Sequence, residues 1–400
     1  MSSDTQVAIE AGDTLENLVN QFTDPYACLR ELIQNAMDAG SETIEVWFEF
    51  NAYEKGDKGI AIIHVDDTGE GMTRRIIDTK LTQLFSSSKE DDLTKVGKFG
   101  IGFVSVFALD PNAVIVDTGR DGEYWRLIFK ENRKFDRILL NHPVEGTQIQ
   151  IVKETTPSEF EKMKRKSIET IRFWCKHVLS EIRVDGMVLN EEFRLGHRHE
   201  YVYSGQETEI VVAPSQESEP FCGFYNRGLT LLERTQKEFP GVAFKVSSRY
   251  LEHTLTRDNV IQDKHYHKAM ALLREVIDGE FRRKLFETAA QSFDYELFGH
   301  LAPRLGRRPP SELVNWPVLP TVSGARVSIK TVQKAAKSQK MVLYAPNETA
   351  LTKAISQEKG VPVLKWEGPE SQPGLERLLN HITSGAPFVF ADRAWALPQI

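Results

Sequence analysis

Two glycine-rich turns, each joined to an apolar segment, constrain most strongly what this chain can fold into. The first, DDTGEGM at 66–72, follows the segment 59–65, in which three isoleucines and an alanine predict a buried strand. The second, GKFGIGF at 97–103, opens into an apolar segment that we expect to be helical. Glycines at such places let the backbone turn sharply and let a flat ligand approach it. Each turn alone is a weak signal, because most such strings are plain turns.

A polar stripe is expected on a helix upstream of both turns. Asp24 and Pro25 are typical of a helix start, and this helix should run to about residue 39. At about 100° per residue, Glu31, Asn35 and Asp38 share one face, and the apolar residues take the opposite one. A solvated surface face is the ordinary explanation of this pattern, but the neighbouring motifs favour a functional one.

The chemistry of these motifs suits a nucleotide. An Asp at a strand end, here Asp67, can accept a hydrogen bond from an exocyclic amine. The N–H groups and dipole at the start of the helix after 97–102 favour a phosphate. The spacing GxxGxG excludes a P-loop and fits a dinucleotide-binding fingerprint poorly. A fourth motif, Gly146-Thr147, precedes the expected strand 148–153.

In this order the four motifs resemble those of the gyrase, heat-shock protein 90, histidine kinase and MutL (GHKL) ATPase superfamily. ELIQNAMDAG is similar to its N-box, DDTGEGM and GKFGIGF to its two glycine boxes, and GTQIQI to its last nucleotide-contacting strand. Within the superfamily the sequence most resembles the heat-shock protein 90 chaperones. The similarity extends weakly to about residue 365. SRYLEHTLTRDNV at 248–260 is similar to the middle-domain segment that carries a γ-phosphate arginine, here Arg257.

The resemblance implies a role for each matching residue. Glu31 would be the general base that activates water, and Arg257 would stabilise the developing charge. Asn35 would coordinate Mg²⁺, and Asp67 with Thr147 would bind the adenine amine. The other implied nucleotide contacts, which include a lid over residues 73–99, are Asp38, Gly71, Met72, Ser88, Lys89, Lys98, Phe99, Gly100, Ile101, Gly102 and Phe103.

The fold that the resemblance implies is α+β. An ATP-binding α/β sandwich of the Bergerat type would span 1–195, and an α/β middle domain would span 196–400, split near 305. No C-terminal dimerisation domain is recognised, so we expect either a truncated form or a naturally short homologue. The pattern predicts a polar surface segment at 73–96 and single helices over 157–179 and 264–290. The other expected helices are 13–21, 329–339 and 347–358, and the other expected strands are 5–10, 44–51, 113–118, 124–130, 208–212, 228–233, 243–246, 341–344 and 361–364.

Composition limits the function classes. The 400 residues carry 50 Lys and Arg against 57 Asp and Glu, a net charge of −7, which does not favour DNA or anionic lipid as partners. Three widely spaced cysteines argue against a disulfide framework or a zinc site. The N-terminus lacks the features of a signal peptide, and no apolar run suits a membrane span.

The expected protein is therefore a cytoplasmic chaperone of the stress response that hydrolyses ATP with Mg²⁺. It would act on client proteins and could form a homodimer through strand 5–10, with no nucleic acid or membrane partner. Two alternatives stay open. One is a nucleotide-operated DNA clamp of the mismatch-repair or topoisomerase type, and the other is an ATP-binding switch with negligible turnover.

Overall fold

The computed structural model describes residues 24–82, 102–132, 134–254, 259–292, 294–305 and 311–391. It divides into two compact units that are not contiguous in the sequence. The first comprises the described parts of Met1–Phe193 with Phe224–Leu232 and Arg249–Ile261, and the second comprises the remainder. Two short segments from the middle of the chain therefore belong with the N-terminal part.

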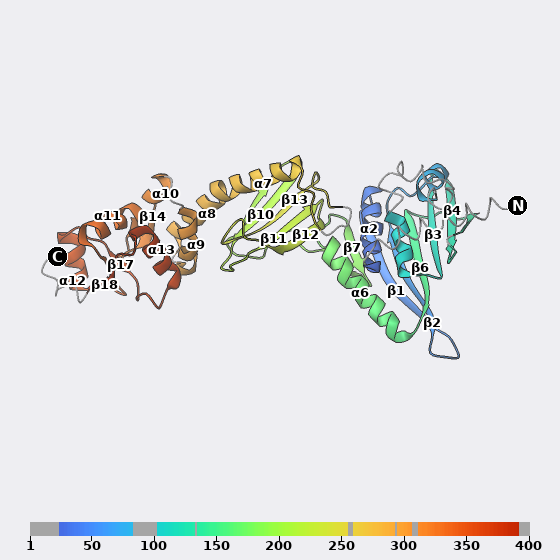
Figure 1. The fold of residues 1–400 in the computed structure, drawn as a ribbon, viewed down its shortest axis with the longest axis horizontal. Coiled ribbons are helices and arrows are strands. Elements are labelled where there is room, and N and C mark those ends of the chain that lie inside the picture. The colour runs from blue at the N-terminus through green and yellow to red at the C-terminus, as the bar shows by residue number, and fades with distance from the viewer. Residues whose placement is uncertain are drawn as a thin grey trace, which may run out of the picture. The chain divides into compact units, whose positions relative to one another are not determined.

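The first unit is built on an eight-stranded sheet of order β5-β4-β3-β6-β2-β1-β7-β8 (Figure 1). Neighbouring strands are antiparallel except β1 and β7, which are parallel. The strands are β1 (Thr43–Ala52), β2 (Gly59–Asp67), β3 (Ala113–Arg120), β4 (Glu123–Lys130), β5 (Phe135–Leu139), β6 (Thr147–Thr155), β7 (Glu181–Val184) and β8 (Met187–Val188).

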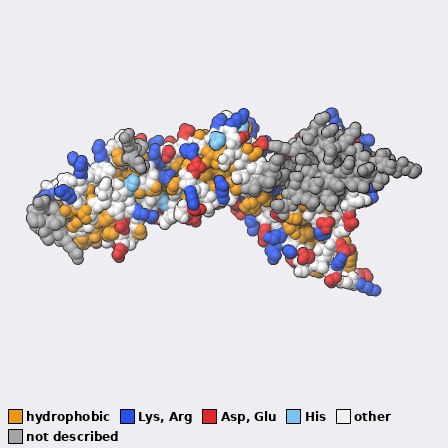
Figure 2. Space-filling view, in the orientation of Figure 1, with side chains coloured by type: hydrophobic (Ala, Val, Ile, Leu, Met, Phe, Trp, Pro, Cys, Tyr) orange, Lys and Arg blue, Asp and Glu red, His pale blue; other side chains and the backbone are white. Residues whose placement is uncertain are grey.

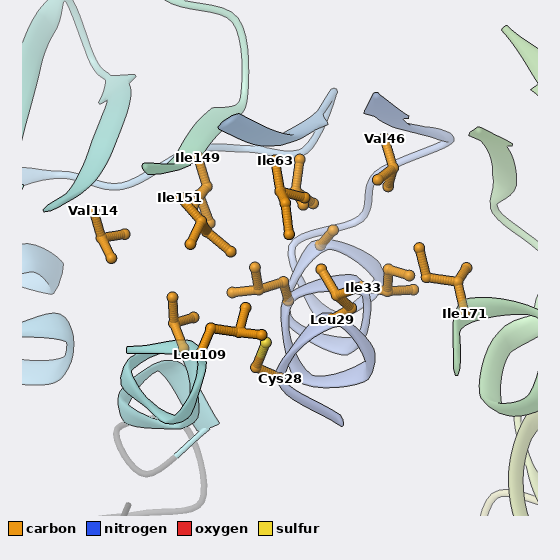
Figure 3. Packing of buried hydrophobic residues seen from close by; sticks show 14 of the residues in the cluster. Cys28, Leu29, Ile33, Val46, Ile63, Leu109, Val114, Ile149, Ile151 and Ile171 are labelled. Atoms are coloured by element: carbon orange, nitrogen blue, oxygen red, sulfur yellow. The ribbon is translucent and has the colours of Figure 1, made fainter. Parts of the chain in front are cut away.

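Helices supply the other half of this unit's core. They are α2 (Cys28–Asp38), which a 3₁₀ turn at Pro25–Ala27 precedes, the 3₁₀ helix Ser105–Leu109, and α6 (Pro157–Cys175). Figure 3 shows inward side chains of the strands, such as Ile63 and Ile151, pointing toward Leu29 and Ile33 of α2. Each is almost fully buried, and such burial contributes about 1.5–3 kcal/mol per side chain. The apolar side of α2 therefore faces the sheet.

Local signals explain where α2 begins and ends. The Asp24 carboxylate accepts a hydrogen bond from the Tyr26 N–H at 3.0 Å, and Pro25 takes the first position of the turn. At the other end Gly40 has φ +76°, which favours glycine, and its N–H bonds the Met37 carbonyl. The helix expected over 24–39 is confirmed.

The second unit contains most of a five-stranded sheet of order β12-β11-β13-β10-β9, a helical segment and a C-terminal α/β part. In the α/β part, three parallel strands of order β17-β16-β18 pack with helices. The strands are β9 (Tyr201–Ser204), β10 (Thr208–Pro214), β11 (Phe221–Asn226), β12 (Leu229–Thr235), β13 (Val242–Ser248), β14 (Pro317–Pro320), β15 (Arg326–Ser328), β16 (Val342–Ala345), β17 (Val363–Lys365) and β18 (Phe388–Phe390). The helices are α7 (Lys264–Val276), α8 (Arg282–Gln291), α9 (Tyr295–Leu305), α10 (Ser311–Asn315), α11 (Ile329–Gln339), α12 (Ala350–Glu358) and α13 (Pro373–Thr383).

Several expected elements differ from the structure. The helix over 264–290 is interrupted, because Gly279 has non-helical angles between α7 and α8. The helix from 157 ends at Cys175 rather than 179. The segment 73–96 is not simply a polar surface segment, since Arg74–Leu81 is helical and buries Ile77. Strand 5–10, helix 13–21 and residues 306–310, next to the expected split near 305, lie outside the described residues.

The described surface has mixed polarity. On the face in Figure 2, acidic and basic side chains are interspersed over the coloured residues. None of the helices in the described ranges is both long enough and apolar enough to span a bilayer. Cys28, Cys175 and Cys222 are buried free thiols.

Candidate functional site

The polar stripe of α2 is not a solvated face. Glu31 is only 6% exposed, Asn35 is half-buried, and Asp38 at the helix end is more open. Gly102, the last glycine of the second turn, lies directly against this stripe. A Cβ on Gly102 would be 3.1 Å from Glu31 Oε2 and 3.9 Å from Asn35 Nδ2. The second glycine turn and the N-terminal helix, which are 70 residues apart, therefore meet.

Asp67 ends β2 opposite Thr147, its partner in β6. Its carboxylate accepts a hydrogen bond from the Gly69 N–H at 2.8 Å. Gly146 has φ +59°, and a Cβ there would be 1.9 Å from the Asp67 carbonyl oxygen and 2.8 Å from Oδ1. Burial raises the pKa of Asp67, and backbone hydrogen bonds from Gly69 and Thr147 oppose this shift. Two separate motifs, the first glycine turn and Gly146-Thr147, thus meet at one carboxylate.

Gly71 and Met72, which follow Asp67 in the first turn, lie against residues next to the same strand ends. Gly71 has φ +67°, and a Cβ there would lie 2.2 Å from the Gly119 carbonyl oxygen and 2.9 Å from that of Gly146. The Met72 side chain is partly buried against the core of the first unit. Only glycine permits so close a backbone approach, which explains why the first turn has glycine at this position.

Thr118, near the end of β3, is a candidate site residue that the sequence did not reveal. It is fully buried, and its hydroxyl oxygen lies 3.1 Å from that of Thr147. It also accepts a hydrogen bond from the Met72 N–H at 3.0 Å and donates to the Gly146 carbonyl at 3.2 Å. The Thr-Gly pair at 118–119 was the available signal, because it repeats the Gly-Thr chemistry of 146–147 on the paired strand.

A buried arginine lies next to the candidate base. Arg30 is 2% exposed, and its guanidinium carbon lies 4.6 Å from the centre of the Trp174 ring of α6. Such a cation–π contact stabilises a buried cation by up to about 2 kcal/mol. Helical periodicity alone did not reveal that Arg30 is buried, because the charged side chain of an amphipathic helix is expected to be solvated.

Phe103, the last residue of the second turn, lies in the core. Its ring centre is 5.2 Å from that of Phe129 and 6.4 Å from that of Phe107, and the side chain is buried. Its expected packing near a nucleotide stays a prediction. Ser88, Lys89, Lys98, Phe99, Gly100, Ile101 and Arg257 lie outside the described residues.

The chain on either side of Arg257 is described, and it belongs to the first unit. The Thr254 N–H donates to the Asn259 carbonyl at 2.9 Å, and the Ile261 N–H donates to the Glu252 carbonyl at 2.7 Å. The two arms, 249–254 and 259–261, therefore pair with each other within the unit that carries Glu31.

Comparison with known proteins agrees with this geometry. Residues 24–169 match the family described as histidine kinase-, DNA gyrase B- and HSP90-like ATPases. The match covers the part of the chain that contains α2 and the strands β1 to β6. The α+β fold seen here, a large antiparallel sheet with helices on it, is consistent with this assignment.

Curated proteins of more than one class are similar to this chain. The chain is 34% identical over 136 residues to the chaperone protein HtpG of Anaplasma phagocytophilum, a match that covers 28% of this chain and 21% of HtpG. It is 26% identical over 204 residues to the DNA mismatch repair protein MutL of Borreliella afzelii, covering 49% of this chain and 30% of MutL. Human sacsin is 26% identical over 141 residues, covering 29% of this chain and 3% of sacsin. The chain therefore spans under a third of each of these relatives.

The donor groups around the polar stripe of α2 would fit Mg²⁺ held mainly by a nucleotide. Within the described ranges, no group of three or more His, Cys, Asp and Glu side chains is arranged to hold a metal ion. Mg²⁺ commonly uses one or two protein oxygens together with substrate phosphates and water. The half-buried Asn35 amide beside Gly102 can supply one such oxygen.

Proposed function

We propose that the chain binds ATP between Asp67 and the polar stripe of α2 and hydrolyses it. The observation that carries this proposal is the pair of close approaches in one unit. Gly146 and Gly69 enclose the Asp67 carboxylate, and Gly102 lies on Glu31 and Asn35. The Asp67 end of this arrangement offers a hydrogen-bond acceptor, and the α2 end offers the Glu31 carboxylate beside a glycine turn.

The Asp67 end selects the base. Its carboxylate accepts a hydrogen bond from the adenine amine, with Thr147 assisting from the paired strand. Guanine presents a carbonyl at the same place, and two facing acceptors repel each other. Gly71 and Met72 line the base pocket. Although burial raises the pKa of Asp67, it must be ionised, or oriented with its acceptor oxygen inward, to perform this role.

The α2 end holds the phosphates. Asn35 provides a ligand for Mg²⁺, which when bound neutralises phosphate charge, and Asp38 contributes through water. The backbone at 98–102 offers N–H groups to the phosphates, and Ser88 and Lys89 reach the nucleotide from the lid. These last contacts are carried by the sequence resemblance alone.

Glu31 is the proposed general base that orients and activates water. Its burial keeps bulk water from competing for the carboxylate, and the missing side chain at Gly102 leaves room beside it. Arg257 is the proposed cation for the developing charge on the γ-phosphate. Its support is the sequence motif, together with the position of both flanking arms in the unit that carries Glu31.

The wider role that we propose is that of an ATP-dependent chaperone of the heat-shock protein 90 type. Residues 196–400 would act as its middle domain, and closure around client proteins would be coupled to hydrolysis. The support is the 34% identity to HtpG over 136 residues and the motif at 248–260. A cytoplasmic location, a stress role and a dimer formed through strand 5–10 belong to the same proposal.

A DNA clamp is the second candidate, because the match to MutL covers 49% of this chain. The net charge of −7 argues against it, since DNA-binding surfaces are basic. A switch with negligible turnover is the third candidate, and the presence of Glu31 argues against it.

One set of assays separates the three. ATP turnover of the chain is compared with that of Arg257→Ala, while aggregation of a denatured client and retention of duplex DNA are measured with and without ATP. The chaperone proposal expects slow turnover that Arg257→Ala abolishes, ATP-dependent suppression of aggregation and no DNA retention at physiological salt. Retention of DNA without client protection would favour the clamp, and tight ATP binding without turnover would favour the switch.

A further inference from the structure

The turn between β11 and β12 has an unusual backbone for its sequence. Its two central residues, Arg227 and Gly228, have φ +48° and +86°. Two-residue hairpin turns with both residues at positive φ strongly prefer Asn, Asp and Gly. An arginine at the first position is therefore disfavoured, and such a choice points to a function of the side chain.

The turn is held firmly within the first unit. A Cβ on Gly228 would be 2.1 Å from the His177 carbonyl oxygen, so the backbone lies in direct contact with the end of α6. The Thr230 hydroxyl donates to the Phe173 carbonyl at 2.8 Å, and the Tyr225 ring is buried with its centre 5.4 Å from that of His177. Packed residues on both sides thus fix the direction in which Arg227 projects.

Two neighbouring side chains of the turn reach two different segments. The Asn226 amide donates to the Leu251 carbonyl at 2.7 Å and to the Arg249 carbonyl at 3.3 Å. Arg227 Nη1 lies 3.5 Å from Asp38 Oδ1 at the C-terminal end of α2. Asn226 thus holds the arm 249–254, and Arg227 meets the helix that carries Glu31.

The Arg227–Asp38 pair contributes little to stability. The arginine side chain is 60% exposed, and such pairs contribute about 0–1 kcal/mol. The pair matters because it holds the end of α2 next to the turn. Burial raises the pKa of Asp38 and Arg227 lowers it, so the arginine favours the ionised carboxylate at the end of α2.

We propose that Asn226 and Arg227 are positioning residues for ATP hydrolysis. They hold the arm 249–254 and the end of α2 in one fixed relation, without touching the nucleotide. The inference rests on the proposed ATPase function. Because β11 begins and β12 ends in residues of the second unit, the turn is covalently continuous with that unit, and it contacts the helix of the general base through the Arg227–Asp38 pair.

The test separates turnover from binding. Asn226→Ala, Arg227→Ala and Arg227→Lys are prepared in the full chain, and kcat is measured beside the Kd of a non-hydrolysable ATP analogue. We expect each alanine variant to lower kcat about tenfold, with Kd within about twofold, because small misplacements of catalytic groups cost this much or more. Arg227→Lys, which keeps the charge, should recover part of the loss.

Arg283→Ala is the matched control, since Arg283 is a similarly exposed arginine in an ion pair with Glu287. It should leave both kcat and Kd unchanged. Alanine variants whose kcat stays within twofold of the parent would overturn the inference, as would a parallel loss of kcat, affinity and thermal midpoint. If the parent turns over and Glu31→Ala does not, either result leaves the proposed function intact. If the parent has no turnover, both proposals fail.

Discussion

The hydroxyl oxygens of Thr118 and Thr147 lie 3.1 Å apart on the paired strands β3 and β6. This contact ties β3 to β6 next to Asp67. Thr118 also bonds the Met72 N–H and the Gly146 carbonyl, so one hydroxyl links three separate segments around Asp67. The pocket should therefore depend on a residue that was not among the expected nucleotide contacts.

Thr118→Val tests this dependence. Valine keeps the shape but leaves the Met72 N–H without its acceptor, and an unsatisfied buried donor costs about 1–3 kcal/mol. We expect the affinity for ATP to fall about tenfold, measured by calorimetry. Thr288→Val is the control, because the Thr288 hydroxyl bonds the Lys284 carbonyl within its own helix, α8, in the second unit. Equal ATP affinities of the two variants would contradict the expectation.

Gly146→Ala should damage the same pocket more severely. The added Cβ would lie 1.9 Å from the Asp67 carbonyl oxygen, so the two strands must separate. Gly122→Ala is a close control, since Gly122 also has positive φ, at +85° against +59°, but has no atom within 4 Å of its Cβ position. Both variants carry backbone strain of about 1 kcal/mol, and only Gly146→Ala should lose ATP binding. Retained binding in Gly146→Ala would show that the pocket lies elsewhere.

A second carboxylate, Asp66, gives a prediction about pH. It pairs with Glu45 of β1 and Gln148 of β6. Gln148 in turn pairs with Asp117 of β3. Burial, followed by repulsion from Asp67, Glu45 and Asp117, raises the pKa of Asp66 to about 7. A folded-state pKa above the unfolded value means that the folded state holds its proton more tightly. Stability from this group is therefore complete below about pH 4 and is lost as pH rises to 7.

Asp66→Asn should remove this pH dependence. We expect its thermal midpoint to exceed that of the parent at pH 8, and the difference to shrink toward pH 4. Asp117→Asn should instead lower the thermal midpoint at pH 8, because Asp117 is buried and accepts two hydrogen bonds from Arg126 at 2.6 and 2.7 Å. A gain from Asp66→Asn that is equal at pH 4 and pH 8 would contradict the assigned pKa.

Most of the first unit could be predicted from the sequence because its signals are local. The Asp24-Pro25 start, the Gly40 end and the buried β2 depend on neighbouring residues. β5 was not predicted, because four of its five residues are exposed and show no alternation. In the second unit, helix α9 was missed because it contains Pro303, which ordinarily marks a helix end.

The candidate site also contains residues that the sequence predicted and residues that it did not. Glu31, Asn35, Asp67 and Gly102 were found because each belongs to a motif with its own spacing. Thr118 and Arg227 were not, since their roles arise from strand register and from a hairpin whose packing partner is about 50 residues away. Such relations are set by tertiary structure, and no local pattern encodes them.

The most direct test of the account is the single-turnover rate of ATP hydrolysis by Glu31→Gln beside the parent, with ATP affinity measured for both. Glutamine keeps the size and hydrogen-bonding reach of Glu31 but cannot accept the proton. The account predicts a loss of at least about a hundredfold in rate, with the affinity within about threefold of the parent. A variant that hydrolyses ATP at the parent's rate would contradict the central claim, whatever its affinity.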